Sequence, residues 1–202
     1  MNRGPLALGL NVGDRPGQSV KAGIPDAAEA KQEWSMKIIR TFPSIEQVQQ
    51  LPLQLTMSVP PDWEDRNGHV NVQYYQALYE LGGYQVLEDV DITDAYLQEN
   101  NFGLFDLEHH LHYLAELMAG DVVCTYNRIL SMNTKRFHGM YFILNESREY
   151  LACTLEYVTA GVNLGLRRSA PFPPELNRAL QLQLERHKQL DWQAPVCGHL
   201  QV

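Results

Sequence analysis

A short acidic segment contains the residues best suited to chemistry. It reads Asp65-Arg66-Asn67-Gly68-His69 and precedes a stretch with helical hydrophobic spacing. A carboxylate ahead of a helix can act as a general base on water or attack a carbonyl carbon itself. The first N–H groups of a helix have no partner within it and can stabilise an oxyanion, and Gly68 allows a ligand to approach the backbone. The segment therefore predicts acid–base chemistry at Asp65, with oxyanion binding near Gly68 and His69.

The same residues also fit structural roles. Asp65 and Asn67 can cap a helix within an Asx turn. His69 can order the loop through hydrogen bonds, and Glu116 can pair with a basic side chain. Both interpretations stay open from these residues alone.

Other signatures of chemistry are weaker. His110 and His112 would project from one face of a strand, but no third ligand follows at a spacing typical of metal sites, so we expect no metal. There is no Gly-x-Ser-x-Gly elbow, and the Gly-x-x-x-Gly segment at 161–165 lacks the βαβ context of a dinucleotide site. Arg167 and Arg168 are adjacent guanidinium groups that suit phosphate, or simply occupy a solvated turn.

Hydrophobic periodicity and capping residues predict the elements that would position these groups. Helices are expected at about 27–40, 45–51 and 70–86, with another opened by Pro174, and strands at 53–59, 104–116, 121–131, 136–145 and 150–160. Two adjacent glycines, Gly82 and Gly83, either weaken the long helix or allow another backbone to approach it closely. A strand, a long helix and an antiparallel meander indicate an α+β fold, whose open sheet edge favours pairing with a second copy.

Composition excludes several classes of protein. The 202 residues include 24 acidic and 16 basic side chains, a formal net charge of −8, which argues against nucleic acid or an anionic membrane as a partner. No apolar run is long enough to span a bilayer. Three cysteines without metal-type spacing favour a reducing compartment, so we expect a cytoplasmic protein.

The order of the motifs resembles a known enzyme family. The pattern is Asp65-x-Asn67-Gly68-His69-Val70-Asn71-x-x-x-Tyr75, followed later by Tyr113-Leu114-x-Glu116-x-x-x-Gly120-Asp121. Over about residues 50–162 it resembles the hot-dog fold thioesterases of the 4-hydroxybenzoyl-CoA and acyl-ACP type. The resemblance implies a curved antiparallel sheet of about five strands around a long central helix, and an acyl thioester as the substrate.

The resemblance also implies roles for single residues. Asp65 would be the catalytic carboxylate, with Asn67, His69 and Glu116 as further catalytic residues. The chain departs from the acyl-ACP pattern at Val72, where many relatives have a second Asn, and at Leu117 and Met118, which stand near a Cys of those enzymes. These departures argue for coenzyme A as the acyl carrier.

A narrower resemblance rests on three segments: Pro61-Asp62-Trp63, Tyr113-Leu114-x-Glu116 and Arg168-Ser169-Ala170-Pro171-x-Pro173. These are similar to thioesterases found with, or fused to, L-carnitine dehydrogenases, which act on betainyl-CoA. A quaternary ammonium acyl group would then meet an aromatic cage, for which Trp63, Tyr74 and Tyr113 are the candidates. Arg167 and Arg168 would contact the phosphates of coenzyme A. The acidic segment 62–121, with 13 acidic side chains and one basic, suits a cationic acyl group.

These observations predict three parts: a flexible leader with short helices (1–50), a hot-dog domain (51–165) and a tail with an amphipathic helix (166–202). We expect an acyl-CoA thioesterase without a cofactor, acting as a dimer or a dimer of dimers. The alternative is a non-catalytic hot-dog module that binds acyl-CoA. Hot-dog hydratases and dehydratases would need a different pattern of His and carboxylate at the helix entry.

Overall fold

An antiparallel sheet forms the centre of the structure, a computed structural model that describes residues 41–88 and 92–202. The strands are β1 (Leu53–Ser58), β2 (Phe102–Tyr113), β3 (Val122–Met132), β4 (Arg136–Asn145), β5 (Tyr150–Asn163) and β6 (Arg168–Ser169). The helices are α2 (Ile45–Val48), the 3-10 turn η1 (Pro61–Trp63), α3 (Gln73–Glu88), α4 (Asp94–Glu99) and α5 (Pro174–His187). None of the helices in these two stretches is long and apolar enough to cross a membrane.

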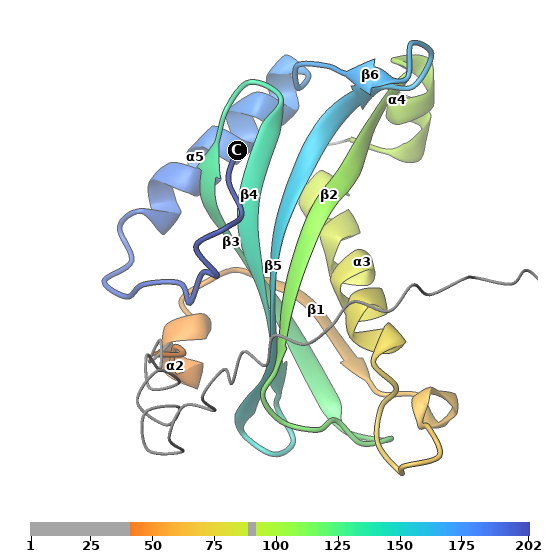
Figure 1. Ribbon diagram of the computed structural model, residues 1–202, viewed down its shortest axis with the longest axis vertical. Coiled ribbons are helices and arrows are strands. Elements are labelled where there is room, and N and C mark those ends of the chain that lie inside the picture. Colours follow the sequence, from red (N-terminus) through yellow and green to blue (C-terminus); the bar gives the residue numbers. More distant parts are fainter. Residues whose placement is uncertain (1–40, 89–91) are drawn as a thin grey trace, which may run out of the picture. The chain divides into compact units, whose positions relative to one another are not determined.

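The strand order is β1-β3-β4-β5-β2, with β6 paired to β5. Strands β3, β4 and β5 form a meander as predicted. The strand expected at 104–116 was predicted as the first strand of that meander, which is wrong: β2 does not pair with β3 but lies at an outer edge, where β5 is its one partner among the described strands. Figure 1 shows the sheet curving around α3. The predicted α+β hot-dog architecture is therefore confirmed.

Helix α3 packs its apolar side on the concave face of the sheet. Leu78 is completely buried, and Tyr75 is nearly so, in a cluster that includes Val123 and Ile143. The side chain of Asn71 caps the helix by accepting a hydrogen bond from the N–H of Gln73 at 3.1 Å. The helix therefore begins three residues later than the expected position 70.

Gly82 allows close contact between α3 and the sheet. A Cβ at this position would overlap the hydroxyl of Tyr141 and lie 2.7 Å from Oγ1 of Thr125. The close approach expected from the glycine pair therefore occurs at Gly82, but the neighbours are side chains and not another backbone. At Gly83, no atom lies within 4 Å of the position a Cβ would take.

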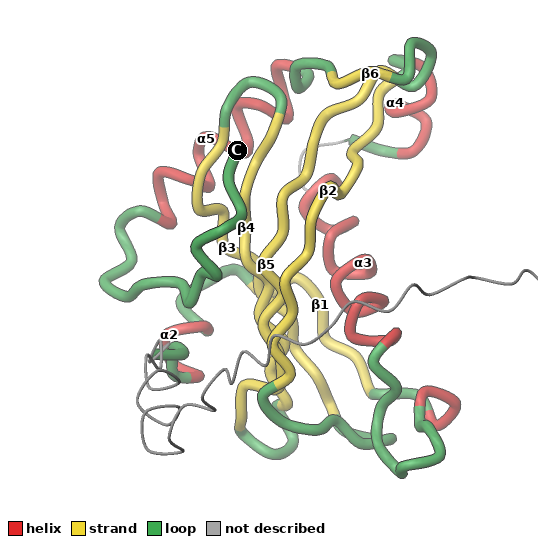
Figure 2. Tube along the Cα trace, in the orientation of Figure 1, coloured by secondary structure: helices red, strands yellow, loops and turns green. Residues whose placement is uncertain are grey.

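The opposite face of the sheet is covered by α2 and by the segment after α5, which Figure 2 shows as a long loop. Trp192 in this segment packs on Phe142, with ring centroids 5.6 Å apart. Helix α5 is fixed at β3, where Nδ1 of His187 accepts the N–H of Ile129 at 2.9 Å. Burial, aided by the nearby Arg128, lowers the pKa of His187 to about 4, so the ring is neutral and can accept this bond.

Several boundaries differ from the sequence-based expectations. Helix α2 is shorter than 45–51, while α4 and β6 were not predicted. Strand β2 ends at Tyr113, so Glu116 lies in the loop after the strand and not within it. The expected helix at 27–40 and the leader at 1–24 lie outside the described residues.

The two glycines of α3 provide a matched pair for a stability test. Gly82→Ala should lower the free energy of unfolding by about 1–3 kcal/mol, because the added methyl group forces Tyr141 and Thr125 to move. Gly83→Ala should raise it by up to about 1 kcal/mol, because Ala favours the helix and meets open space. Urea denaturation of both variants measures the difference. Equal effects of the two substitutions would show that the contact at Gly82 does not matter.

Candidate functional site

The loop ahead of α3 is a closed turn. The N–H of Gly68 donates to the carbonyl of Asp65 at 3.0 Å, and the N–H of Asp65 donates to the carbonyl of His69 at 2.9 Å. Gly68 has φ +81°, a conformation that favours glycine. A bridge between Glu64 and Val70 holds the two sides of the loop together. Hydrogen bonds between neighbouring residues thus close the turn around Asp65.

The Asp65 carboxylate is partly buried, with 19% of its side chain exposed. Its Oδ1 accepts the N–H of Asn67 at 2.7 Å and lies 3.7 Å from Nδ1 of His69. The second oxygen, Oδ2, is 3.4 Å from Nδ2 of Asn67. Three of the four predicted catalytic residues therefore lie together, and the Asx turn expected as their structural role is present as well.

The loop after β2 packs against this turn. The N–H of Val70 donates to the carbonyl of Leu117 at 2.8 Å, and the N–H of Leu117 donates to the hydroxyl of Tyr75 at 3.2 Å. Burial raises the pKa of Tyr75 to about 12, so this hydroxyl is neutral at physiological pH. The hydroxyl of Tyr150 donates to the carbonyl of Glu116. The Glu116 backbone is thus held near the Asp65 turn, while its side chain is exposed.

The three aromatic candidates form two separate pairs. Trp63 stacks on Tyr74 with centroids 4.6 Å apart and planes 2° apart, which leaves no space for a cation between the rings. Tyr113 instead meets Tyr75 edge-on at 5.1 Å. The structure therefore does not arrange Trp63, Tyr74 and Tyr113 around one shared space.

The two arginines lie far from Asp65 within one chain. Arg168 begins β6 and Arg167 precedes it, with its guanidinium carbon 5.5 Å from the ring centre of Phe105. Figure 1 shows β6 at one end of the sheet and the loop between η1 and α3 at the other. A single chain therefore does not bring the predicted phosphate contacts to the predicted catalytic carboxylate.

One charged residue near a cavity was missed by the sequence analysis. Asp106 on β2 accepts a hydrogen bond from the hydroxyl of Tyr79 at 3.0 Å and another from Thr159. The signal that could have revealed it is an acidic residue between Phe105 and Leu107 in an otherwise apolar strand segment.

The two histidines considered as metal ligands lie close together. The Nε2 atoms of His110 and His112 are 3.4 Å apart, and no cluster of three metal-binding side chains occurs within 41–88 and 92–202.

The Thioesterase-like superfamily pattern matches residues 59–180. The chain belongs to this superfamily. This thioesterase-like chain is 29% identical over 133 residues to the betainyl-CoA thioesterase of Pseudomonas aeruginosa, a match that covers 65% of this chain and 83% of that protein. It is 27% identical over 141 residues to the L-carnitine dehydrogenase/betainyl-CoA thioesterase of Rhizobium meliloti, a match covering 69% of this chain and 28% of that longer protein.

Solved structures share the fold of the thioesterase-like chain. A Staphylococcus aureus protein in complex with CoA superposes with a TM-score of 0.67 and 24% identity, covering 75% of this chain and 96% of that one. The 1,4-dihydroxy-2-naphthoyl-CoA thioesterase of Synechocystis superposes with a TM-score of 0.58 and 17% identity, covering 63% and 93%. The predicted family, the hot-dog fold and the thioesterase class are confirmed.

Proposed function

We propose that this chain hydrolyses an acyl-CoA thioester at the loop ahead of α3, with Asp65 as the catalytic carboxylate. The observation that supports this most is the geometry of that carboxylate. Its Oδ1 accepts the N–H of Asn67 at 2.7 Å, whereas Oδ2 accepts only a long hydrogen bond, 3.4 Å, from Nδ2 of Asn67. Oδ2 therefore keeps acceptor capacity with which to activate water or attack the thioester carbon. The turn thus orients a charged oxygen at the edge of the protein without a metal.

The same turn offers an oxyanion donor. The N–H groups of Asp65, Asn67, Gly68 and Val70 all donate within the protein. Among the described residues, the N–H of His69 has no such acceptor, so it can bind the developing oxyanion. We assign Asn67 and the His69 ring to positioning Asp65, and the exposed Glu116 to the rim of the same site.

For the acyl group we propose betainyl, because the curated relatives are named for betainyl-CoA.

A cytoplasmic location is part of the proposal, and the three buried free cysteines support it. The alternative of a non-catalytic acyl-CoA-binding module is supported by the Asx turn, which gives Asp65 a structural role without catalysis.

We further propose a dimer formed through the outer edge of β2, with a dimer of dimers as a second possibility. The part of this edge strand at 105–108 is exposed, and it carries Leu107, which is 47% exposed. Antiparallel pairing of two β2 strands would place the Phe105 end of one protomer beside the Tyr113 end of its partner. Arg167 and Arg168 would then lie near the partner's catalytic turn, which explains their distance from Asp65 within one chain.

The catalytic assignment predicts the behaviour of Asp65→Asn. This variant should lower kcat by at least about 100-fold on every acyl-CoA that the wild type hydrolyses, because the amide cannot act as base or nucleophile. Release of free thiol from a panel including betainyl-CoA measures the rate. Asp62→Asn, an exposed carboxylate in the same segment, is the matched control and should retain activity. Tight binding of acyl-CoA without thiol release by the wild type would favour the non-catalytic module.

The dimer proposal predicts the effect of a charge on the β2 edge. Leu107→Arg should convert the dimer to a monomer and abolish most thioesterase activity, because like charges would face each other across the paired strands. Leu182→Arg is the control, since Leu182 is 53% exposed but lies on α5. Light scattering after size-exclusion chromatography gives the masses. A Leu107→Arg protein with unchanged mass and activity would contradict pairing through β2.

The phosphate assignment predicts a change that depends on the substrate. The double variant Arg167→Gln/Arg168→Gln should raise KM for acyl-CoA several-fold, with a smaller effect on kcat. The KM for the corresponding acyl-pantetheine, which lacks the nucleotide, should not change. The exposed pair Arg178→Gln/Arg186→Gln on α5 is the matched control. Equal effects on both substrates would rule out a contact to the nucleotide.

A further inference from the structure

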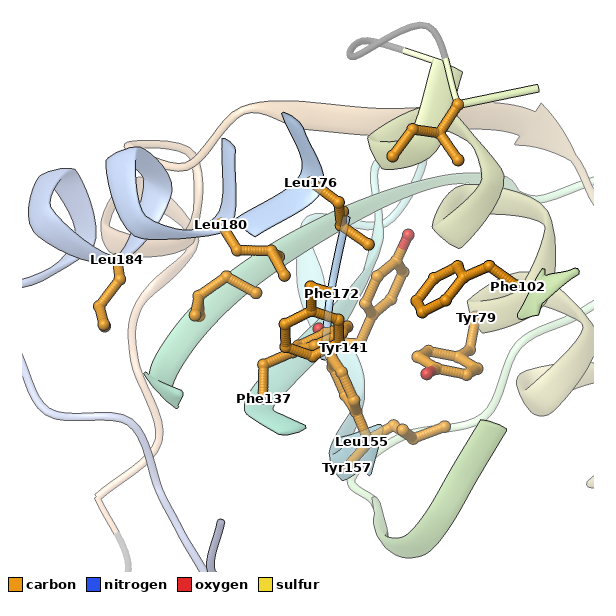
Figure 3. Close-up of a cluster of buried hydrophobic side chains, with 12 residues drawn as sticks. Tyr79, Phe102, Phe137, Tyr141, Leu155, Tyr157, Phe172, Leu176, Leu180 and Leu184 are labelled. Atoms are coloured by element: carbon orange, nitrogen blue, oxygen red, sulfur yellow. The ribbon is translucent and has the colours of Figure 1, made fainter. Parts of the chain in front are cut away.

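A cavity of about 380 Å³ lies against the C-terminal half of α3, away from the Asp65 turn. Leucines of α4 and α5 cover part of it, and aromatic side chains from α3 and three strands form much of the wall, as Figure 3 shows for most of them. These aromatic residues are Tyr79, Phe102, Phe105, Phe137, Tyr141 and Tyr157. Its size is that of a small-ligand site.

The charged groups of the cavity are all acidic. Asp106 and Glu80 contribute carboxylates, and no Lys, Arg or His is among the described residues that line it. The guanidinium of Arg167 lies outside the lining, with its central carbon 5.5 Å from the ring centre of Phe105. Aromatic faces attract cations through their negative π-face, and a carboxylate in a partly desolvated wall adds a Coulombic attraction. The combination favours a positively charged ligand over a neutral or anionic one.

The neighbours of Asp106 favour the ionised form of its carboxyl group. Its Oδ1 accepts hydrogen bonds from the hydroxyls of Tyr79 and Thr159, and its Oδ2 lies 3.2 Å from Nε2 of His109. Burial by itself would raise the pKa of Asp106, but the bonds from His109, Thr159 and Tyr79 outweigh it and hold the pKa below its usual value. The side chain remains 28% exposed, so the carboxylate is fixed in place without being sealed off.

We propose that this cavity is the acyl subsite and that Asp106 determines its specificity, selecting acyl groups that end in a quaternary ammonium. The proposal rests on the proposed thioesterase function and on pairing through β2. It assigns the cation to a different place from the cage of Trp63, Tyr74 and Tyr113 expected from the sequence, in which Trp63 and Tyr74 are closed on each other.

The length of α3 determines which catalytic turn the cavity serves. Gln73 begins the helix and Gly83 lines the cavity, so ten residues, or about 15 Å, separate the two along the axis. A short acyl group bound in the cavity cannot reach Asp65 of the same protomer. Phe105 also lines the cavity, and antiparallel β2 pairing would bring this end of the strand to the partner's Asp65 turn. Each site would then combine the cavity of one protomer with the carboxylate of the other.

The test compares cationic substrates with their neutral isosteres. Trimethylammonioacetyl-CoA and its longer trimethylammoniobutyryl homologue are each paired with the compound in which carbon replaces the ammonium nitrogen. We expect the wild type to prefer at least one cationic substrate by tenfold or more in kcat/KM. Asp106→Asn keeps an acceptor for Tyr79 and should lose most of that preference, measured as the ratio of kcat/KM for the cationic substrate to that for its isostere. Glu99→Gln removes an exposed charge on α4, outside both the cavity wall and the β2 edge, and should keep the preference.

The outcomes separate this proposal from the one on which it rests. If the wild type releases no thiol from any acyl-CoA, the proposed function itself fails. If it hydrolyses cationic substrates and isosteres equally well, or if active Asp106→Asn keeps the full preference, the acyl subsite proposal is wrong. The wild-type ratio of kcat/KM for a cationic substrate to that for its isostere can overturn the proposal by itself. The proposal therefore remains testable even if Asp106→Asn does not fold.

Discussion

The packing of α3 on the concave face of the sheet determines where every candidate group lies. Leu78 is fully buried in this contact, and Gly82 allows the helix to approach Tyr141 and Thr125. Because an α-helix rises about 1.5 Å per residue, fixing it at these points also fixes both of its ends. The N-terminal end presents the Asp65 turn, and the C-terminal half forms a wall of the aromatic cavity. The helix thus holds the proposed catalytic carboxylate and the proposed acyl subsite at a set distance.

The distance between the Asp65 turn and the cavity makes the outer edge of β2 relevant to the proposed site. An edge strand with exposed apolar side chains is a liability for a monomer, because its free backbone groups can pair with other chains. In this chain, the same strand begins at Phe102, carries Asp106 four residues further along and ends at Tyr113. If two β2 strands paired antiparallel, their backbone groups would form hydrogen bonds with each other. The same pairing would bring the Phe105 end of one protomer beside the Tyr113 end of its partner. Stability and the assembly of the site would then depend on the same interface.

Local patterns in the sequence were sufficient for the elements that depend on local physics. The alternation in 53–59, the Ser44 capping box and Pro174 at the start of α5 all predicted elements that are present. The end of β2 was misplaced because the residues after Tyr113 stay mostly apolar, with Glu116 as the one charged side chain before Gly120, although the chain leaves the strand at Tyr113. Helix α4 has only six residues, too few for a periodic signal. The hydrogen bonds of Asp106 could not be predicted from the sequence, because its partners Tyr79 and Thr159 are 27 and 53 residues away.

The charges of this chain are divided along its sequence, and this division bears on the proposed acyl-CoA substrate. Coenzyme A is a polyanion, and residues 62–121 carry 13 acidic side chains and only one basic. This segment includes the Asp65 turn and Asp106, so it would repel the nucleotide and attract a cationic acyl group. Residues 122–202 carry nine basic and six acidic side chains, among them the adjacent Arg167 and Arg168. A substrate with a cationic acyl group and an anionic carrier therefore matches the separation of charge along this chain, whereas an anionic acyl group would meet repulsion at the cavity.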